Sequence, residues 1–137
     1  MYSRLRKVAI WYCISHAVAG SLYIPLHTII PLILNFFSSE ILNLNLEDLP
    51  LPHENFWFVL SVSAMYMISY TAYLVWKDEK NANAWKIIIL SKGVSSLFFL
   101  LYFFLRIRAF AYLFGVFVDA PLFAIALYIW KIYRKQT

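Results

Sequence analysis

Two charged residues, Lys92 and Asp119, lie inside long apolar segments, and their spacing predicts that they meet. Lys92 is 15 residues before Ile107, the middle of a short basic connection, and Asp119 is 12 residues after it. In a helical hairpin their depths would differ by roughly 4.5 Å, which a lysine side chain can cover. The favoured interpretation is an ion pair that ties two helices together. The alternatives are a proton- or ion-coupled site, or a Lys92 that reaches the aqueous interface.

Small polar residues follow Lys92 along the same segment. Gly93, Ser95 and Ser96 come within four residues of it and cover a broad face of a helix. Small side chains let helices approach closely in lipid, and their hydroxyls bond across the contact. Close packing is therefore the favoured interpretation, and a ligand pocket that includes Ser95 and Ser96 is the alternative.

A second candidate site is a face that carries two of the three histidines. His16, Gly20, Tyr23 and His27 have offsets of 0, 4, 7 and 11, which place them on one side of a helix. Neutral imidazole binds metals and haem iron, and His53 could join His27 near one surface. The favoured interpretation is that each histidine satisfies a local hydrogen bond. The identity of any metal or cofactor stays open, with His16 and His27 as candidate ligands.

A tyrosine stripe lies on the next apolar segment. Tyr66, Tyr70 and Tyr73 follow the i, i+4, i+7 spacing of one helix face. Such a stripe could line a pocket for a quinone or a lipid. Helix packing with the hydroxyls turned inward is the favoured interpretation.

The composition indicates a membrane protein. Of 137 residues, 63% are hydrophobic and 14% are charged, against about 25% charged in a soluble domain. So small a soluble domain has too little interior for this much apolar surface. The formal net charge is +5, but the basic residues cluster at the ends of apolar segments, which excludes a nucleic-acid partner. The phenylalanines of the last two segments, among them Phe98 and Phe99, are expected mainly to face lipid.

Four segments have the length of about 20 apolar residues that a bilayer requires. They cover residues 8–36, 56–76, 85–105 and 109–133, with an extended outer loop at 38–55 whose apolar side chains would rest on the membrane or a partner. The expected fold is an all-α membrane protein, a single domain of four transmembrane helices in an up-down bundle. Pro25 predicts a kink in the first helix, since proline removes a backbone donor.

The distribution of Lys and Arg predicts the orientation. Three regions carry three such residues each: the N-terminal tail, the loop between the second and third segments, and the C-terminal tail. Because basic residues stay on the cytoplasmic side, both termini are expected there. Without a recognisable targeting segment, the bacterial inner membrane is the default location.

Three classes of function are compatible with these sequence features. The leading hypothesis is a non-enzymatic accessory or assembly subunit, which packs against other integral membrane proteins or another copy of itself. The first alternative is a small proton- or ion-coupled transporter that uses Asp119 and Lys92. The second is a membrane module that binds a quinone, a lipid or haem. No cofactor is the leading expectation.

Overall fold

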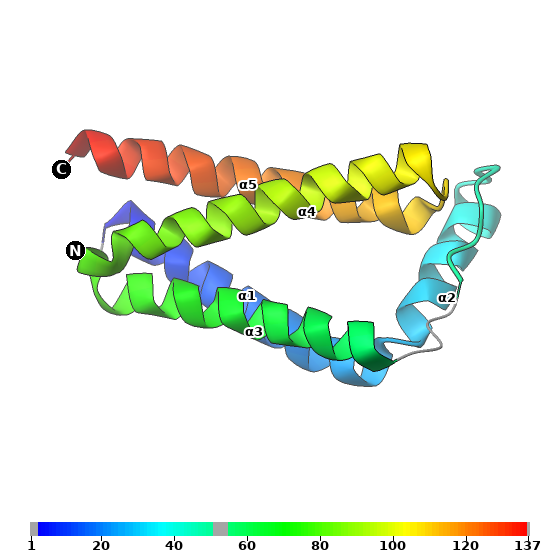
Figure 1. Ribbon diagram of the computed structural model, residues 1–137, viewed down its shortest axis with the longest axis horizontal. Helices are drawn as coiled ribbons and strands as arrows, with labels where there is room; N and C mark the ends of the chain where they lie inside the picture. Colours follow the sequence, from blue (N-terminus) through cyan, green and yellow to red (C-terminus); the bar gives the residue numbers. More distant parts are fainter. Residues whose placement is uncertain (1–2, 51–54, 137) are drawn as a thin grey trace.

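The computed structural model describes residues 3–50 and 55–136, and within them the chain is all-helical. Five α-helices are joined by short helical turns and loops (Figure 1). Their bounds are α1 (Arg4–Leu26), α2 (Ile29–Phe36), α3 (Asn55–Lys77), α4 (Trp85–Leu105) and α5 (Phe110–Gln136). A π-helical turn, η1 (Phe37–Ile41), follows α2, and a 3-10 turn, η2 (Glu79–Ala84), joins α3 to α4. Four of the helices, α1, α3, α4 and α5, are long and apolar enough to cross a membrane.

The expectation of four helices is wrong by one, because residues 8–36 form two helices. Pro25 lies in the last turn of α1, which ends at Leu26, and a new helix begins at Ile29. Pro25 lacks the N–H that would bond to the preceding turn, so the helix is weakened where it ends. Pro31 is the third residue of α2, where a backbone N–H has no helical partner and proline is tolerated. The kink expected near Pro25 is therefore a break between two helices.

The long helices form two pairs. α1 packs along α3, and α4 packs along α5, with fewer contacts between the pairs (Figure 1). Glycines permit close approach within each pair. A Cβ on Gly115 would lie 2.7 Å from the Phe99 ring, and one on Gly20 would lie 3.3 Å from the Met65 Cβ. Phe99 thus packs on the partner helix, which corrects the expectation that it faces lipid.

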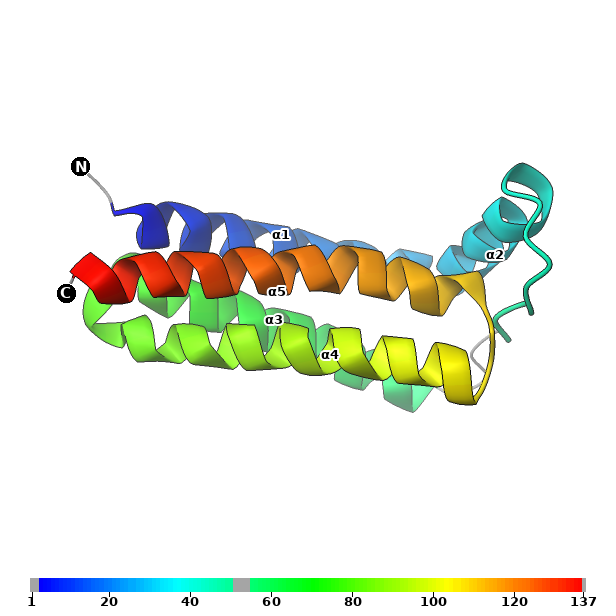
Figure 2. The same ribbon diagram turned by 90° about the horizontal axis from the view of Figure 1, so that it is seen from above.

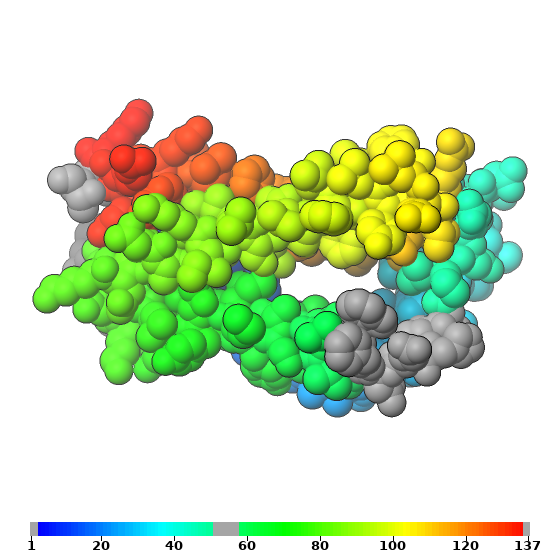
Figure 3. Space-filling model, in the orientation of Figure 1, coloured from blue at the N-terminus to red at the C-terminus, as the bar shows by residue number. Residues whose placement is uncertain are grey.

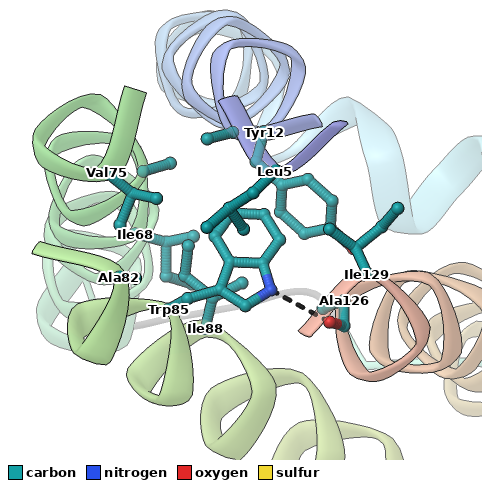
Figure 4. Close-up of a cluster of buried hydrophobic side chains, with 11 residues drawn as sticks. Leu5, Tyr12, Ile68, Val75, Ala82, Trp85, Ile88, Ala126 and Ile129 are labelled. Carbon is teal, nitrogen blue, oxygen red and sulfur yellow. Dashed lines mark hydrogen bonds between the residues drawn. The ribbon is translucent and has the colours of Figure 1, made fainter. Parts of the chain in front are cut away.

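The pairs meet at one end of the molecule and separate toward the other. The buried core fills the end that carries both termini and η2, here called the closed half (Figure 4). Its members come from all four long helices and η2: Leu5, Ala9, Tyr12, Ile68, Ala72, Val75, Ala82, Trp85, Ile88, Ala126 and Ile129. Toward α2 lies the open half, where the space-filling view shows an opening between the pairs (Figure 3).

α2 crosses the far end of the open half, and the segment after η1 is fixed to it. The side-chain amide of Asn35 donates to Leu49 O at 3.0 Å, and Leu49 N donates to Asn35 Oδ1 at 2.9 Å. Glu47 N donates to Arg108 O at 3.1 Å, in the connection between α4 and α5. Residues 42–50 thus join the end of α2 to the α4–α5 pair as an extended strap, with Leu42 and Leu44 exposed.

Candidate functional site

The centre of the candidate site is an ion pair between α4 and α5. Lys92 Nζ donates to Asp119 Oδ1 at 2.9 Å, and each side chain is only 11% exposed. Ser95 Oγ donates to the second carboxylate oxygen, Oδ2. The pair lies where the helix offsets predict it. Both carboxylate oxygens have a partner, so the carboxylate is held by charge and hydrogen bonding together.

The ion pair lies at the border between the two halves. Lys92 follows the core residue Ile88 by one helical turn, and Asp119 is two turns before the core residue Ala126. No described core residue of α4 or α5 lies beyond this level toward α2. The charges are therefore placed where the packed core of α4 and α5 ends.

Tyr12 connects α1 to both helices of the other pair. Its hydroxyl donates to Leu122 O of α5, and its ring meets the Trp85 ring edge-on at a centroid distance of 5.2 Å. Trp85 in turn donates from Nε1 to Ala126 O at 2.9 Å (Figure 4). Tyr12 is not among the candidate residues predicted from the sequence. The signal was available, because Tyr12 precedes His16 by four residues and extends the same helix face.

His16 is buried beneath this tyrosine. Its ring stacks on Tyr12 with centroids 5.6 Å apart, and its Nδ1 lies 2.9 Å from Tyr12 O. A carbonyl oxygen only accepts, so Nδ1 carries the proton and Nε2 of the neutral ring is left as an acceptor. The imidazole is thus oriented by its own helix.

His27 and Tyr23 are not part of this cluster. His27 lies in the turn after α1, where Nδ1 is 3.0 Å from Ile24 O and the ring packs on Phe58 at 4.5 Å. Tyr23 contacts the same phenylalanine at 5.8 Å. His53 lies outside the described residues. Across residues 3–50 and 55–136, no three His, Cys, Asp or Glu side chains come together in a way that could hold a metal ion.

The structure separates the remaining candidate residues. Tyr66 packs against Gly20 and its hydroxyl is 2.7 Å from Ser21 Oγ, whereas Tyr70 is 62% exposed. The expectation that the tyrosine hydroxyls turn inward is therefore wrong for Tyr70. Ser95 faces the ion pair, while Ser96 lines a different surface, the outer groove between α4 and α5. These residues do not form one pocket.

The geometry suits a structural tie. An ion pair with an added hydroxyl donor offsets the cost of placing two charges in an apolar interior, provided that both partners remain. Removal of either partner would leave one charge uncompensated. For a proton-coupled role, Asp119 would have to release its contacts with Lys92 and Ser95 when it binds a proton.

Comparison with known proteins gives no match to a family model, to a curated protein or to a solved structure.

Proposed function

We propose that the chain is a small integral membrane protein that serves as a non-enzymatic accessory or assembly subunit of a larger membrane complex. The single observation that carries this is the Lys92–Asp119–Ser95 cluster. Its charges are satisfied within the chain, as expected of a packing element. In this proposal α1, α3, α4 and α5 cross the bilayer as an up-down bundle, supported by their length and apolar composition.

The proposed orientation places the closed half on the cytoplasmic side. Both termini and η2 lie at this end (Figures 1 and 2). The N-terminal tail, the η2 region and the C-terminal tail hold nine Lys and Arg residues, and the opposite end holds Arg106 and Arg108. Basic residues concentrate on the cytoplasmic side of membrane proteins, which supports this orientation. The bacterial inner membrane stays the default location in this proposal.

The partner surface in this proposal is the outer face of α2 and the strap. Leu32, Ile33 and Phe36 of α2 are each more than half exposed, and Leu42 and Leu44 extend the apolar surface along the strap. Since α2 crosses the end of the bundle, these side chains are available to the outer interface or to another integral membrane protein.

The test is extraction in native lipid particles, followed by size measurement and identification of co-purifying chains. We expect the wild type in a particle larger than a monomer, with the same partner in repeated preparations. Ile33→Glu should remove that partner, whereas Ile87→Glu, on the exposed face of α4, serves as the matched control. A folded wild-type monomer that carries no other chain would overturn the proposal.

The second candidate is a small proton- or ion-coupled transporter. The observation in its favour is that Asp119 and Lys92 form a buried charge pair where the described buried core of α4 and α5 ends. Asp119→Asn should then abolish proton-linked flux in vesicles without loss of folding. Under the accessory-subunit proposal, the same vesicles show no flux for either protein.

A further inference from the structure

A long apolar groove runs along the outer face of the α4–α5 pair. Its volume is about 700 Å³, and its wall includes Gly93, Leu97 and Leu100 of α4 with Phe123 and Leu127 of α5. Gly93 has no side chain to fill the groove, and a Cβ there would lie 3.0 Å from the Phe123 ring. The groove is separate from the ion pair, which lies on the buried side of α4.

A polar cavity continues the groove at the end that carries the termini. Its volume is about 410 Å³, and its wall includes Glu79, Lys80, Lys86 and Arg134. Lys86 and Trp130 line both spaces, and Lys86 Nζ lies 5.5 Å from the centre of the Trp130 ring. The apolar groove and the basic cavity therefore share one junction.

The cavity carries excess positive charge. Three of the four charged residues in its wall are basic, and the acidic one, Glu79, accepts a hydrogen bond from Ser3. Within the described part of the chain, neither Lys86 nor Arg134 forms an ion pair with a carboxylate. An anion in this cavity would supply the missing negative charge.

The dimensions match one lipid in one leaflet. Lys86 and Leu100 are 14 residues apart, which is about 21 Å along a helix. Half of a hydrocarbon core is about 15 Å, so a groove that starts near the interface at Lys86 is long enough to hold an acyl chain of one leaflet. Tryptophan and lysine are typical of the headgroup level, and the cytoplasmic leaflet is the anionic one.

We propose that this groove and cavity bind an anionic phospholipid, with the phosphate at Lys86 and Arg134 and one acyl chain along Gly93 and Leu97. The inference rests on the membrane insertion in the proposed orientation. Glu79 keeps its contact with Ser3, while Lys80 stands at the cavity wall as a further cation for the headgroup.

The test is native mass spectrometry of the protein in nanodiscs that contain phosphatidylglycerol and phosphatidylcholine. We expect one retained phosphatidylglycerol per chain and a clear preference over phosphatidylcholine. The double variant K86Q/R134Q should weaken that lipid's affinity by about tenfold or more, because each basic residue near the surface contributes to anion binding. Lys7→Gln removes a charge at the same end outside the cavity and should leave retention unchanged.

A second pair of variants tests the groove. Leu97→Trp places a large ring in it and should reduce lipid retention, whereas Leu105→Trp, exposed on the same helix beyond the groove, should not. Equal retention of both lipids by the wild type, or unchanged retention in K86Q/R134Q, would overturn the lipid site. Membrane flotation is measured in parallel. Protein that floats but retains no anionic lipid contradicts only this site, and protein that does not float contradicts the proposed insertion.

Discussion

The closed and open halves are built from the same four helices but are held together differently. In the closed half, Tyr12 of α1 and Trp85 of α4 contact each other across the two pairs. In the open half, close contacts such as Phe99 on Gly115 lie within one pair. Apolar helices gain nothing from burial against one another in lipid, so helices stay together only where shapes fit or polar groups bond. The pairs are thus joined where large rings and hydrogen bonds bridge them.

The largest expected effect is at the border between the halves. Asp119→Leu leaves the Lys92 ammonium without its carboxylate in an apolar interior. We expect the free energy of unfolding to fall by about 3–5 kcal/mol, measured by denaturation in detergent micelles. The double variant K92M/D119L should regain most of that loss. If the double variant is as unstable as the single one, the pair is not acting as a tie.

The next prediction compares substitutions at two aliphatic residues of α4. Ile88 is fully buried in the closed half, and Leu105 is 73% exposed at the end of the open half. Ile88→Ala should destabilise the protein by about 2–5 kcal/mol through the cavity it leaves. Leu105→Ala should change stability by less than about 0.5 kcal/mol. Thermal unfolding of both variants measures the contrast, and equal losses would mean that the halves are packed alike.

Packing inside the open half is tested at a glycine. A Cβ at position 115 would lie 2.7 Å from the Phe99 ring, so Gly115→Ala forces the ring or α5 to move. We expect a loss of about 1–3 kcal/mol by thermal unfolding. The combination with Phe99→Leu, which removes the ring, should relieve part of that loss. A Gly115→Ala variant as stable as wild type would show that α4 and α5 are farther apart here.

The smallest expected loss of stability comes from removing the hydroxyl of Tyr12. Tyr12→Phe removes its hydrogen bond to Leu122 O but keeps the ring on Trp85 and His16. The expected loss is about 0.5–1.5 kcal/mol. Tyr12→Leu also removes the aromatic contacts and should cost more. Identical stabilities for the two variants would assign no role to the ring contacts.

The sequence predicted those features that depend on distance along one or two helices. Lys92 and Asp119 could be paired by counting residues from Ile107, because a short connection fixes the register of a hairpin. The long helices could be located by their apolar length. The break after Leu26 was harder, since Pro25 alone is compatible with either a kink or an end.

The arrangement of the two pairs could not be predicted from the sequence, because helical periodicity identifies a face of a helix and not the helix that this face contacts. Tyr12 lies on the same face as His16, yet only the structure brings it to Leu122, 110 residues away. Tyr70 shows the opposite error. Its spacing fits a packing stripe, but it lies on the exposed side of α3.

The split between the halves is tested most directly by distances between spin labels on α3 and α4. Cysteine pairs are introduced at three depths, seven residues apart on each helix, so that the labels keep nearly the same direction. From η2 outward the pairs are Leu74 with Ile87, Met67 with Val94, and Leu60 with Leu101. Cys13→Ala removes the native thiol. In nanodiscs we expect the distance to grow at each step away from η2 (Figure 1). The same distance at all three depths would show that the two pairs do not separate.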